Sequence, residues 1–144
     1  MKTHISTAVV LVGLLSLAGS AAVNTEELAL SARVPFDFTA GTAKLAAGTY
    51  TITRPTMSPN VILIRSVNQG AFLVADRSYG PARNEPPRLV FHRYENHHFL
   101  RGVSFGGGLA MSLPETAEER EWAAARNRKV ASGPTVVHVP VAVE

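Results

Sequence analysis

The chain has 144 residues, of which 14 are Lys or Arg and 11 are Asp or Glu, and it contains no cysteine. Disulfide, thiolate and iron–sulfur chemistry are therefore excluded. The formal net charge of +3 becomes +2 if Lys2 is removed with a leader, since 13 basic residues then face 11 acidic ones. Such a small excess does not predict a nucleic-acid partner.

The N-terminus has the pattern of a secretory signal peptide. Lys2 precedes an apolar run over residues 8–18, and small residues follow at the positions that a signal peptidase requires. The run is too short to span a bilayer, and Ser20 stands where a lipoprotein signal has the cysteine that receives the lipid. We therefore expect removal of residues 1–22 and export of residues 23–144 as a single periplasmic or extracellular domain. No lipid anchor and no transmembrane segment are expected after cleavage.

From residue 32 onward, short β-type runs recur at intervals of about ten residues with turn residues between them, the pattern of an antiparallel sandwich or small barrel. In the first run, Val34, Phe36 and Phe38 are expected to point inward, because they alternate with Pro35 and a polar residue. Residues 40–48 are interpreted as a connection. The sequence therefore predicts a mainly β fold, formed by one antiparallel β-sandwich or small barrel.

The clearest hairpin in the sequence joins residues 61–66 to residues 71–76 through a turn at residues 68–70. The unbroken apolar sequence of residues 61–64 predicts a central strand that is covered on both faces. Residues 77–87 follow with three prolines and one glycine, which predict the longest loop of the domain. This loop is either a solvated connector or a functional segment.

Residues 92–98, "HRYENHH", contain three of the five histidines of the chain. A three-residue loop at residues 95–97 would gather the large apolar side chains of both flanking strands on one face, whereas a two-residue loop would scatter them. The three-residue loop is therefore expected. It places Leu89, Phe91, Phe99, Val103 and Phe105 on the core face and His92, Tyr94 and His98 on the opposite face.

Two histidines on one face are too few for zinc. A zinc ion takes either four protein ligands or three protein ligands and a water. A third ligand would have to come from His138 or from a carboxylate. We therefore favour an ordinary hairpin with no metal or other cofactor. The alternative is a metal-binding protein or metal-dependent enzyme that uses His92, His98 and His138.

Residues 102–106, "GVSFG", match the G-x-S-x-G pattern of a hydrolase nucleophile turn. That turn requires a helix after the serine, whereas a glycine run and another short strand follow Ser104. We therefore predict no serine hydrolase activity, and the sequence offers no catalytic residue.

Residues 116–128 have the charge and alanine content of a helix. Thr116 and Glu119 form a capping box, and basic residues crowd the last turn, where they complement the helix dipole. The apolar face is weak and consists of alanines with Trp122, the only tryptophan. We expect Trp122 to anchor the helix to the sheet. The alanines of this face are Ala117, Ala124 and Ala125.

Residues 135–143 alternate valines with other residues after a glycine-proline break, which predicts a strand. Pro140 lacks an amide for a central ladder, so this strand is expected at an outer edge of the protein's own sheet. That arrangement favours a monomer. The alternative is a strand-exchanged dimer, in which the same strand completes the sheet of a second chain.

Four stretches occur in a fixed order along the exported part of the chain: "VPFDF", "LAAGTYTI", "RLVFHRY" and "LPETAEERE". In these stretches the chain resembles an uncharacterised family of small secreted bacterial β-rich proteins. The resemblance covers nearly all of residues 23–144. It implies a signal peptide followed by a compact β domain with one late helix, and it implies no activity, cofactor or catalytic residue.

Taken together, these features predict an exported, non-enzymatic binding or envelope-associated domain whose partner is an envelope or extracellular ligand. Polar and aromatic groups that suit surface recognition are the candidate contact residues. A further alternative is an arginine-mediated binder of acidic glycans, because 11 arginines follow the leader and arginine favours bidentate contacts with carboxylate and phosphate. The candidate contact residues are Tyr79, Arg93, Tyr94 and Arg101.

Overall fold

The computed structural model describes residues 28–79, 85–129 and 133–143. The expected signal peptide over residues 1–22 and its cleavage site lie outside this part of the chain. Within it, the chain forms eleven strands and one helix. They are β1 (Leu28–Val34), β2 (Phe38–Ala40), β3 (Ala43–Leu45), β4 (Gly48–Arg54), β5 (Val61–Arg65), β6 (Gly70–Val74), β7 (Asp76–Tyr79), β8 (Arg88–Tyr94), β9 (His97–Gly106), β10 (Leu109–Ser112), α1 (Ala117–Lys129) and β11 (Thr135–Val143).

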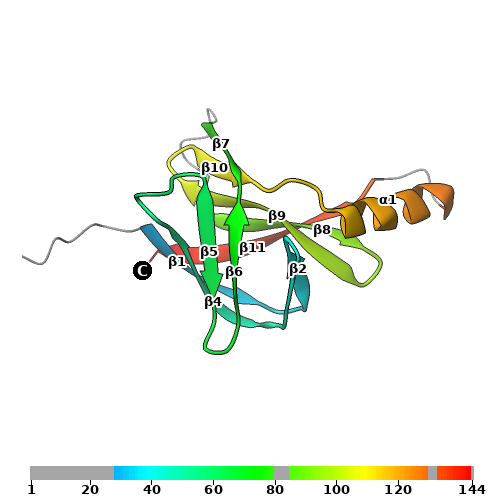
Figure 1. The fold of residues 1–144 in the computed structure, drawn as a ribbon, viewed down its shortest axis with the longest axis horizontal. Helices are drawn as coiled ribbons and strands as arrows, with labels where there is room; N and C mark the ends of the chain where they lie inside the picture. Colours follow the sequence, from blue (N-terminus) through cyan, green and yellow to red (C-terminus); the bar gives the residue numbers. More distant parts are fainter. Residues whose placement is uncertain (1–27, 80–84, 130–132, 144) are drawn as a thin grey trace, which may run out of the picture.

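Nine of the described strands form a nearly closed mixed barrel in the order β3-β2-β9-β8-β11-β1-β4-β5-β6 (Figure 1). β10 pairs with β9 and with β7 beside this path. Side chains help to close the gap between the two ends of the barrel. The amide of Ala46, just after β3, donates a hydrogen bond of 3.0 Å to Oε1 of Gln69, just before β6. The predicted mainly β fold is confirmed, and the architecture is a barrel rather than a sandwich.

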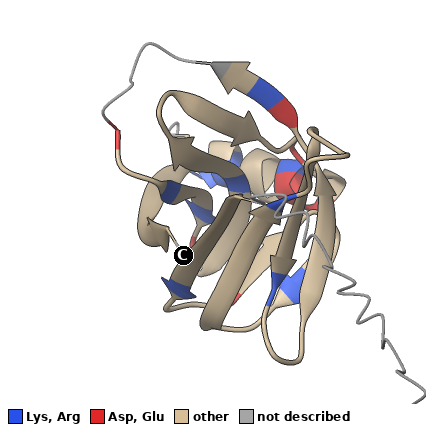
Figure 2. Ribbon diagram, turned by 90° about the vertical axis from the view of Figure 1, so that its left-hand side faces the viewer, with Lys and Arg blue, Asp and Glu red and all other residues tan. Residues whose placement is uncertain are grey.

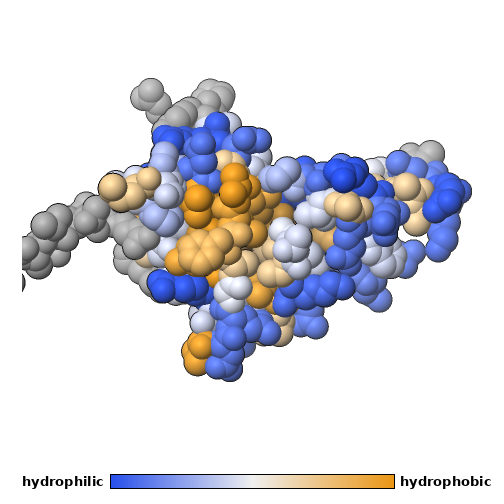
Figure 3. Space-filling model, in the orientation of Figure 1, coloured by the Kyte–Doolittle hydropathy of each residue, from blue (hydrophilic) through white to orange (hydrophobic). Residues whose placement is uncertain are grey.

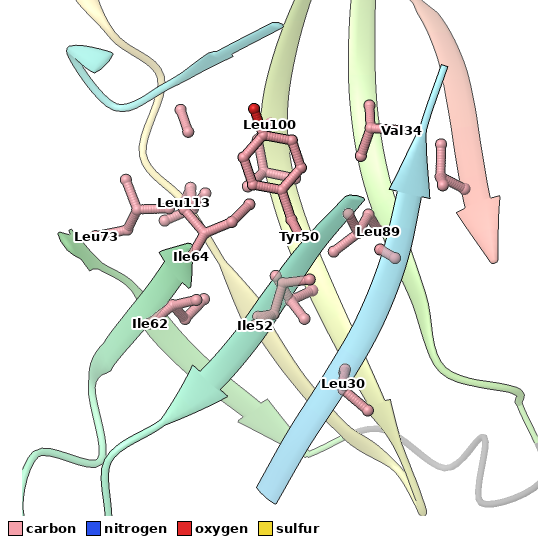
Figure 4. Close-up of a cluster of buried hydrophobic side chains, with 14 of the residues drawn as sticks. Leu30, Val34, Tyr50, Ile52, Ile62, Ile64, Leu73, Leu89, Leu100 and Leu113 are labelled. Atoms are coloured by element: carbon pink, nitrogen blue, oxygen red, sulfur yellow. The ribbon is translucent and has the colours of Figure 1, made fainter. Parts of the chain in front are cut away.

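The barrel interior is filled by apolar side chains, as is usual for a barrel of this size. Val34 and Phe38 are buried and Pro35 is exposed, so the alternation predicted for the first run is confirmed. Phe36 is half-buried, and its ring packs edge-on against Phe91 with centroids 5.0 Å apart. Figure 4 shows how buried side chains from several strands converge, among them Leu30, Tyr50, Ile52, Ile62, Ile64 and Leu89.

Two segments that the sequence assigned to loops contain strands. Within residues 40–48, which were expected to be a connection, β3 pairs with β2 around a turn at Gly41, whose φ of 60° suits glycine. β2 also runs parallel to β9 where Thr39 lies opposite Phe99, so the sheet is not purely antiparallel. β2 and β3 have three residues each, which is too short for an alternating pattern to be recognised.

The predicted loop over residues 77–87 is shorter than expected, because β7 extends to Tyr79 and pairs with β10. Residues 80–84 of this loop lie outside the described part of the chain. After β9, a turn at Gly106, Gly107 and Gly108, with φ values of 83°, 61° and 84°, leads into β10. Ser104 is thus followed by a glycine turn and a strand, as the sequence predicted, and not by a helix.

The β8–β9 hairpin turns at Glu95 and Asn96, and Tyr94 lies opposite His97. The predicted three-residue loop at residues 95–97 is therefore wrong. Glu95 has a φ of 53°, a left-handed conformation of the kind that two-residue hairpin turns use.

The two-residue loop does not scatter the core, because β9 contains a bulge. Near the hairpin tip Phe91 lies opposite Leu100, whereas farther along Val90 lies opposite Gly102, so Arg101 is the extra residue. The bulge shifts the alternation by one position, and Leu100 and Val103 therefore both face the core. Phe99 was expected in the core. It lies instead on the outer face, buried edge-on against Tyr94 with ring centroids 5.9 Å apart.

The hairpin of β5 and β6 is confirmed, with Leu63 opposite Phe72 and Val61 opposite Val74. β5 lies between β4 and β6, so its predicted central position is confirmed, but its outer residues Val61 and Leu63 are only half-buried, so the expected coverage of both faces is wrong. The inner residues are buried, but Phe72 and Val74 on the outer face are 77% and 74% exposed. In Figure 1 helix α1 lies far from this hairpin and covers a different part of the barrel.

The final strand β11 pairs with β8 over residues 135–140 and with β1 over residues 141–143. The prediction that this strand joins the protein's own sheet is confirmed, but its position at an outer edge is wrong. Pro140 lies where the pairing passes from β8 to β1, so its missing amide falls at the junction of two ladders.

Helix α1 begins after Thr116, whose Oγ1 accepts a hydrogen bond of 3.2 Å from the amide of Glu119. The predicted helix and the Thr116 half of the capping box are confirmed, whereas the Glu119 carboxylate bonds to the β8–β9 hairpin. The expected attachment through Trp122 is found, because its half-buried ring stacks on His97 of β9 with centroids 3.9 Å apart. The expected alanine face is not found, because Ala117 and Ala124 are exposed. The buried residue of the helix is Glu119.

Candidate functional site

A buried carboxylate joins the helix to the barrel. The side chain of Glu119 is 1% exposed and accepts hydrogen bonds from three side chains of the β8–β9 hairpin. Arg101 Nη1 donates to Oε2 at 2.9 Å, and Tyr94 Oη donates to Oε1 at 3.3 Å. His92 Nδ1 lies 3.1 Å from Oε1, and this nitrogen has to hold the proton, because an ionised carboxylate only accepts. We call these four residues the Glu119 cluster.

The hairpin geometry explains why these groups meet. His92 and Tyr94 are two positions apart in β8 and therefore share its outer face. Arg101 is the bulge residue of β9, and bulges redirect side chains in this way. The sequence places Glu119 at the third position after the N-cap, so the first helical turn brings its carboxylate to the hairpin.

The cluster satisfies the rule that a buried charge must be paired and hydrogen-bonded. Burial first, and then the negative charge of Glu119 and the hydrogen bond to it, raise the pKa of Tyr94 to about 12. Tyr94 therefore stays a neutral donor over the whole physiological range.

A cleft of about 310 Å³ lies beside the Glu119 cluster, over the outer faces of β8, β9 and β10. Arg88 and Arg101 both line this cleft, and each uses one end nitrogen in an ion pair. Arg88 Nη2 lies 2.7 Å from Oε2 of Glu85. The Nε atoms of Arg88 and Arg101 are buried without a hydrogen-bond partner in the part of the chain that the structure describes. The polar lining consists of Glu85, Arg88, His92, Arg101, Ser104 and Ser112.

Unpaired guanidinium donors in a cleft wall are unusual, because buried polar groups are nearly always hydrogen-bonded. The Lys/Arg and Asp/Glu positions are dispersed over the described strands, without one extended field of a single sign (Figure 2). The positive charge in this cleft comes from Arg88 and Arg101, which line it.

A second, larger cavity of about 460 Å³ lies at the end of the barrel near the hairpin tip. Its charged lining residues are Asp37, Lys44 and Glu118, and the last two face each other at 3.4 Å, with side chains that are 75% and 39% exposed. Exposed pairs of this kind contribute little energy and hold no fixed geometry. The smaller cleft is therefore the better candidate site. Its arginines are less exposed than Lys44 and Glu118, and each has N–H donors that make no hydrogen bond to a described residue.

The three histidines of the metal hypothesis do not converge. His92 lies on the outer face of the barrel, whereas His98 lies opposite Arg93 on the other face of the hairpin and stacks on Phe36 at 3.8 Å. His138 shares the outer face with His92 but is exposed. In residues 28–79, 85–129 and 133–143, no group of three or more His, Asp or Glu side chains is arranged to hold a metal ion.

The predicted contact residues have different surroundings. Tyr94 is 2% exposed and Arg101 is partly buried, and both bind Glu119. Arg93 is exposed near the hairpin tip. Tyr79 ends β7, and its side chain is not among those that the structure describes.

Sequence reasoning missed Arg88 and the role of Glu119. A signal for the first was present, since Arg88, Val90, His92 and Tyr94 share one face of a strand by simple alternation. Nothing local indicated the second, because Glu119 was already explained as a capping residue.

Comparisons of the chain with protein-family models, curated proteins and solved structures gave no match. The resemblance seen in four sequence stretches therefore stays a prediction, and function has to be argued from the site itself. No helix among the described residues is both long and apolar enough to cross a membrane.

Proposed function

We propose that the protein is an exported, non-enzymatic binding domain of the cell envelope or its surroundings, and that its ligand has an anionic group bound in the 310 Å³ cleft. The observation that supports this most strongly is that two partly buried arginines, Arg88 and Arg101, line one cleft, and that each is held by an ion pair through one end nitrogen. Among the alternatives from the sequence, this favours the arginine-mediated binder of acidic glycans.

The chemistry of the guanidinium group supports an anionic ligand. Each guanidinium has five N–H donors in a planar fork that matches carboxylate and phosphate oxygens. Arg101 donates one hydrogen bond to the buried Glu119, and this bond holds the Arg101 side chain in place. The Arg88–Glu85 pair is looser, with side chains that are 30% and 46% exposed, so a ligand can displace Glu85 at little cost.

The size and remaining lining of the cleft fit a sugar. A volume of about 310 Å³ lies at the lower end of the range for small-molecule sites. Ser104 and Ser112 offer hydroxyl groups that donate or accept, and Val90 provides an apolar surface. An acidic monosaccharide unit matches this combination of one anionic contact with several neutral polar ones.

Calorimetric titration of the secreted protein tests this proposal. We expect glucuronate or glucose 6-phosphate to bind with a Kd at or below about 1 mM, and neutral glucose to bind far more weakly. The comparison of the two acids distinguishes a carboxylate from a phosphate ligand. Binding should weaken as salt is added, because the contact is ionic.

A matched pair of arginine variants locates the site. Arg88→Gln should raise the Kd by about tenfold or more, because a charge-assisted hydrogen bond is lost. Arg33→Gln changes an exposed arginine outside the cleft and should leave the Kd unchanged. Failure of both acids to bind, or equal effects of the two substitutions, would contradict the proposal.

A further inference from the structure

The outer face of the β5–β6 hairpin is an exposed apolar strip. It consists of two cross-strand pairs, Leu63 opposite Phe72 and Val61 opposite Val74. Phe72 and Val74 are 77% and 74% exposed, and Leu63 and Val61 are half-buried. Figure 3 shows apolar side chains gathered over this part of the barrel. An apolar cluster of this kind on an ordered sheet marks an interaction surface.

Opposite charges mark the two ends of the strip. Arg65 ends β5 opposite Gly70, and by the alternation of β5 it lies on the outer face with Leu63. Asp76 follows Val74 by two residues at the other end. Both charged residues are exposed. The strip is therefore apolar in its centre, with Arg65 at one end and with Asp76, the first residue of β7, just beyond the other end.

We propose that this strip is the interface of a homodimer, in which a second copy packs the same face against it with its strands antiparallel. A two-fold axis that lies in the interface, midway between the Leu63–Phe72 and Val61–Val74 pairs, reverses the strip end for end. Each Arg65 then meets Asp76 of the second copy, and the two apolar centres bury each other. A surface that is complementary to itself under such a rotation is what a two-fold dimer requires.

Packing of face on face fits better than addition of a strand to the edge of β6. That edge already approaches the β2–β3 hairpin, because a side chain at Gly41 would lie 3.0 Å from Leu73. The hydrogen bond from Ala46 to Gln69 lies at the same place. Two sheets stacked face to face need no free edge. Because β11 stays within its own chain, this dimer exchanges no strand.

Sedimentation equilibrium of the secreted protein tests the proposal, with a dimer expected for the unmodified chain. Phe72→Glu should raise the dimer dissociation constant by about a hundredfold or more, because each copy would bury a charge at the centre of the interface. Val67→Glu is the matched control. Val67 is 99% exposed at the turn of the same hairpin, outside the strip, and its substitution should leave the dimer unchanged.

A charge exchange tests the antiparallel orientation. Arg65→Asp and Asp76→Arg should each weaken the dimer by about tenfold, since each brings like charges together twice in a symmetric interface. The double variant restores opposite charges and should return the dissociation constant to the original value. Parallel packing would bring Arg65 against Arg65, and the double variant would then restore nothing.

Two outcomes would overturn the dimer. A chain that stays monomeric at high concentration contradicts it directly, as does a dimer that Phe72→Glu leaves intact. A monomer that binds phospholipid vesicles and loses this binding with Phe72→Glu would assign the strip to a lipid surface instead. The exposure of Phe72 makes its variants safe for folding, and an unchanged circular dichroism spectrum confirms that.

Discussion

Arg101 donates a hydrogen bond of 2.9 Å to Glu119, and thereby connects a bulge in β9 to the first turn of α1. The helix is thus held to the barrel by this charged pair with its hydrogen-bonded neighbours and by the stack of Trp122 on His97, and not by a stripe of alanines. The same pair fixes Arg101 in the wall of the cleft. The contact that attaches the helix therefore also positions one of the proposed ligand-binding groups.

Loss of the Glu119 carboxylate should destabilise the protein strongly. Glu119→Ala leaves the Arg101 guanidinium partly buried without its partner, and we expect the free energy of unfolding to fall by about 3 kcal/mol. Glu121→Ala, at an exposed position of the same helix, should change it by less than about 0.5 kcal/mol. Urea denaturation measures both, and similar effects of the two substitutions would mean that the cluster does not hold the helix.

The N-cap should make a smaller, separate contribution. Thr116→Ala removes the hydroxyl that accepts the amide of Glu119, at a cost of about 1 kcal/mol. Thr116→Ser keeps a hydroxyl at this position and should recover most of that loss. The same denaturation assay decides the point, and an equal loss for both variants would show that the hydroxyl is not responsible.

Alkaline titration should reveal the surroundings of Tyr94. Its pKa is raised from 10.0 to about 12, chiefly by burial and next by Glu119. The neutral phenol is therefore favoured in the folded state, so the stability that it contributes is present below pH 10 and is lost as the pH rises towards 12. Absorbance of the phenolate should show a late step that Tyr94→Phe removes. Glu119→Gln should move this step to lower pH, and no movement would contradict the contact.

At acidic pH, protonation of His98 should lower the free energy of unfolding. Burial, followed by the positive charge of Arg93, lowers the pKa of His98 below its ordinary value of 6.5. The unfolded chain therefore binds the proton more readily, and stability should fall as the pH drops from 6.5 through the folded-state pKa. Urea midpoints at about pH 7.5 and about pH 5 measure this loss. The loss should shrink in His98→Gln and persist in His138→Gln, which changes an exposed histidine.

Features that depend on neighbouring residues in the sequence could be predicted. The inward positions of Val34 and Phe38 follow from alternation, and the start of α1 follows from the capping box at Thr116. The β5–β6 hairpin follows from its turn residues. Each of these depends on a pattern within a few residues.

Features that depend on distant pairing could not be predicted. The bulge at Arg101 has no local signature, yet it decides which residues of β9 face the core and brings Arg101 to Glu119. The place of β11 between β8 and β1 depends on how the whole barrel closes. The cleft escaped prediction for the same reason, because Arg88 and Arg101 come to line one cleft only through the hairpin register.

Arg88 and Arg101 are proposed to bind one anionic group together, and side-chain NMR observes the two Nε–H groups directly. On titration with glucuronate, we expect the Nε–H signals of Arg88 and Arg101 to shift together along a single saturation curve. The signals of Arg33 and Arg65, which lie outside the cleft, should stay in place. Unchanged signals of Arg88 and Arg101 at saturating glucuronate and at saturating glucose 6-phosphate would contradict the proposed binding site.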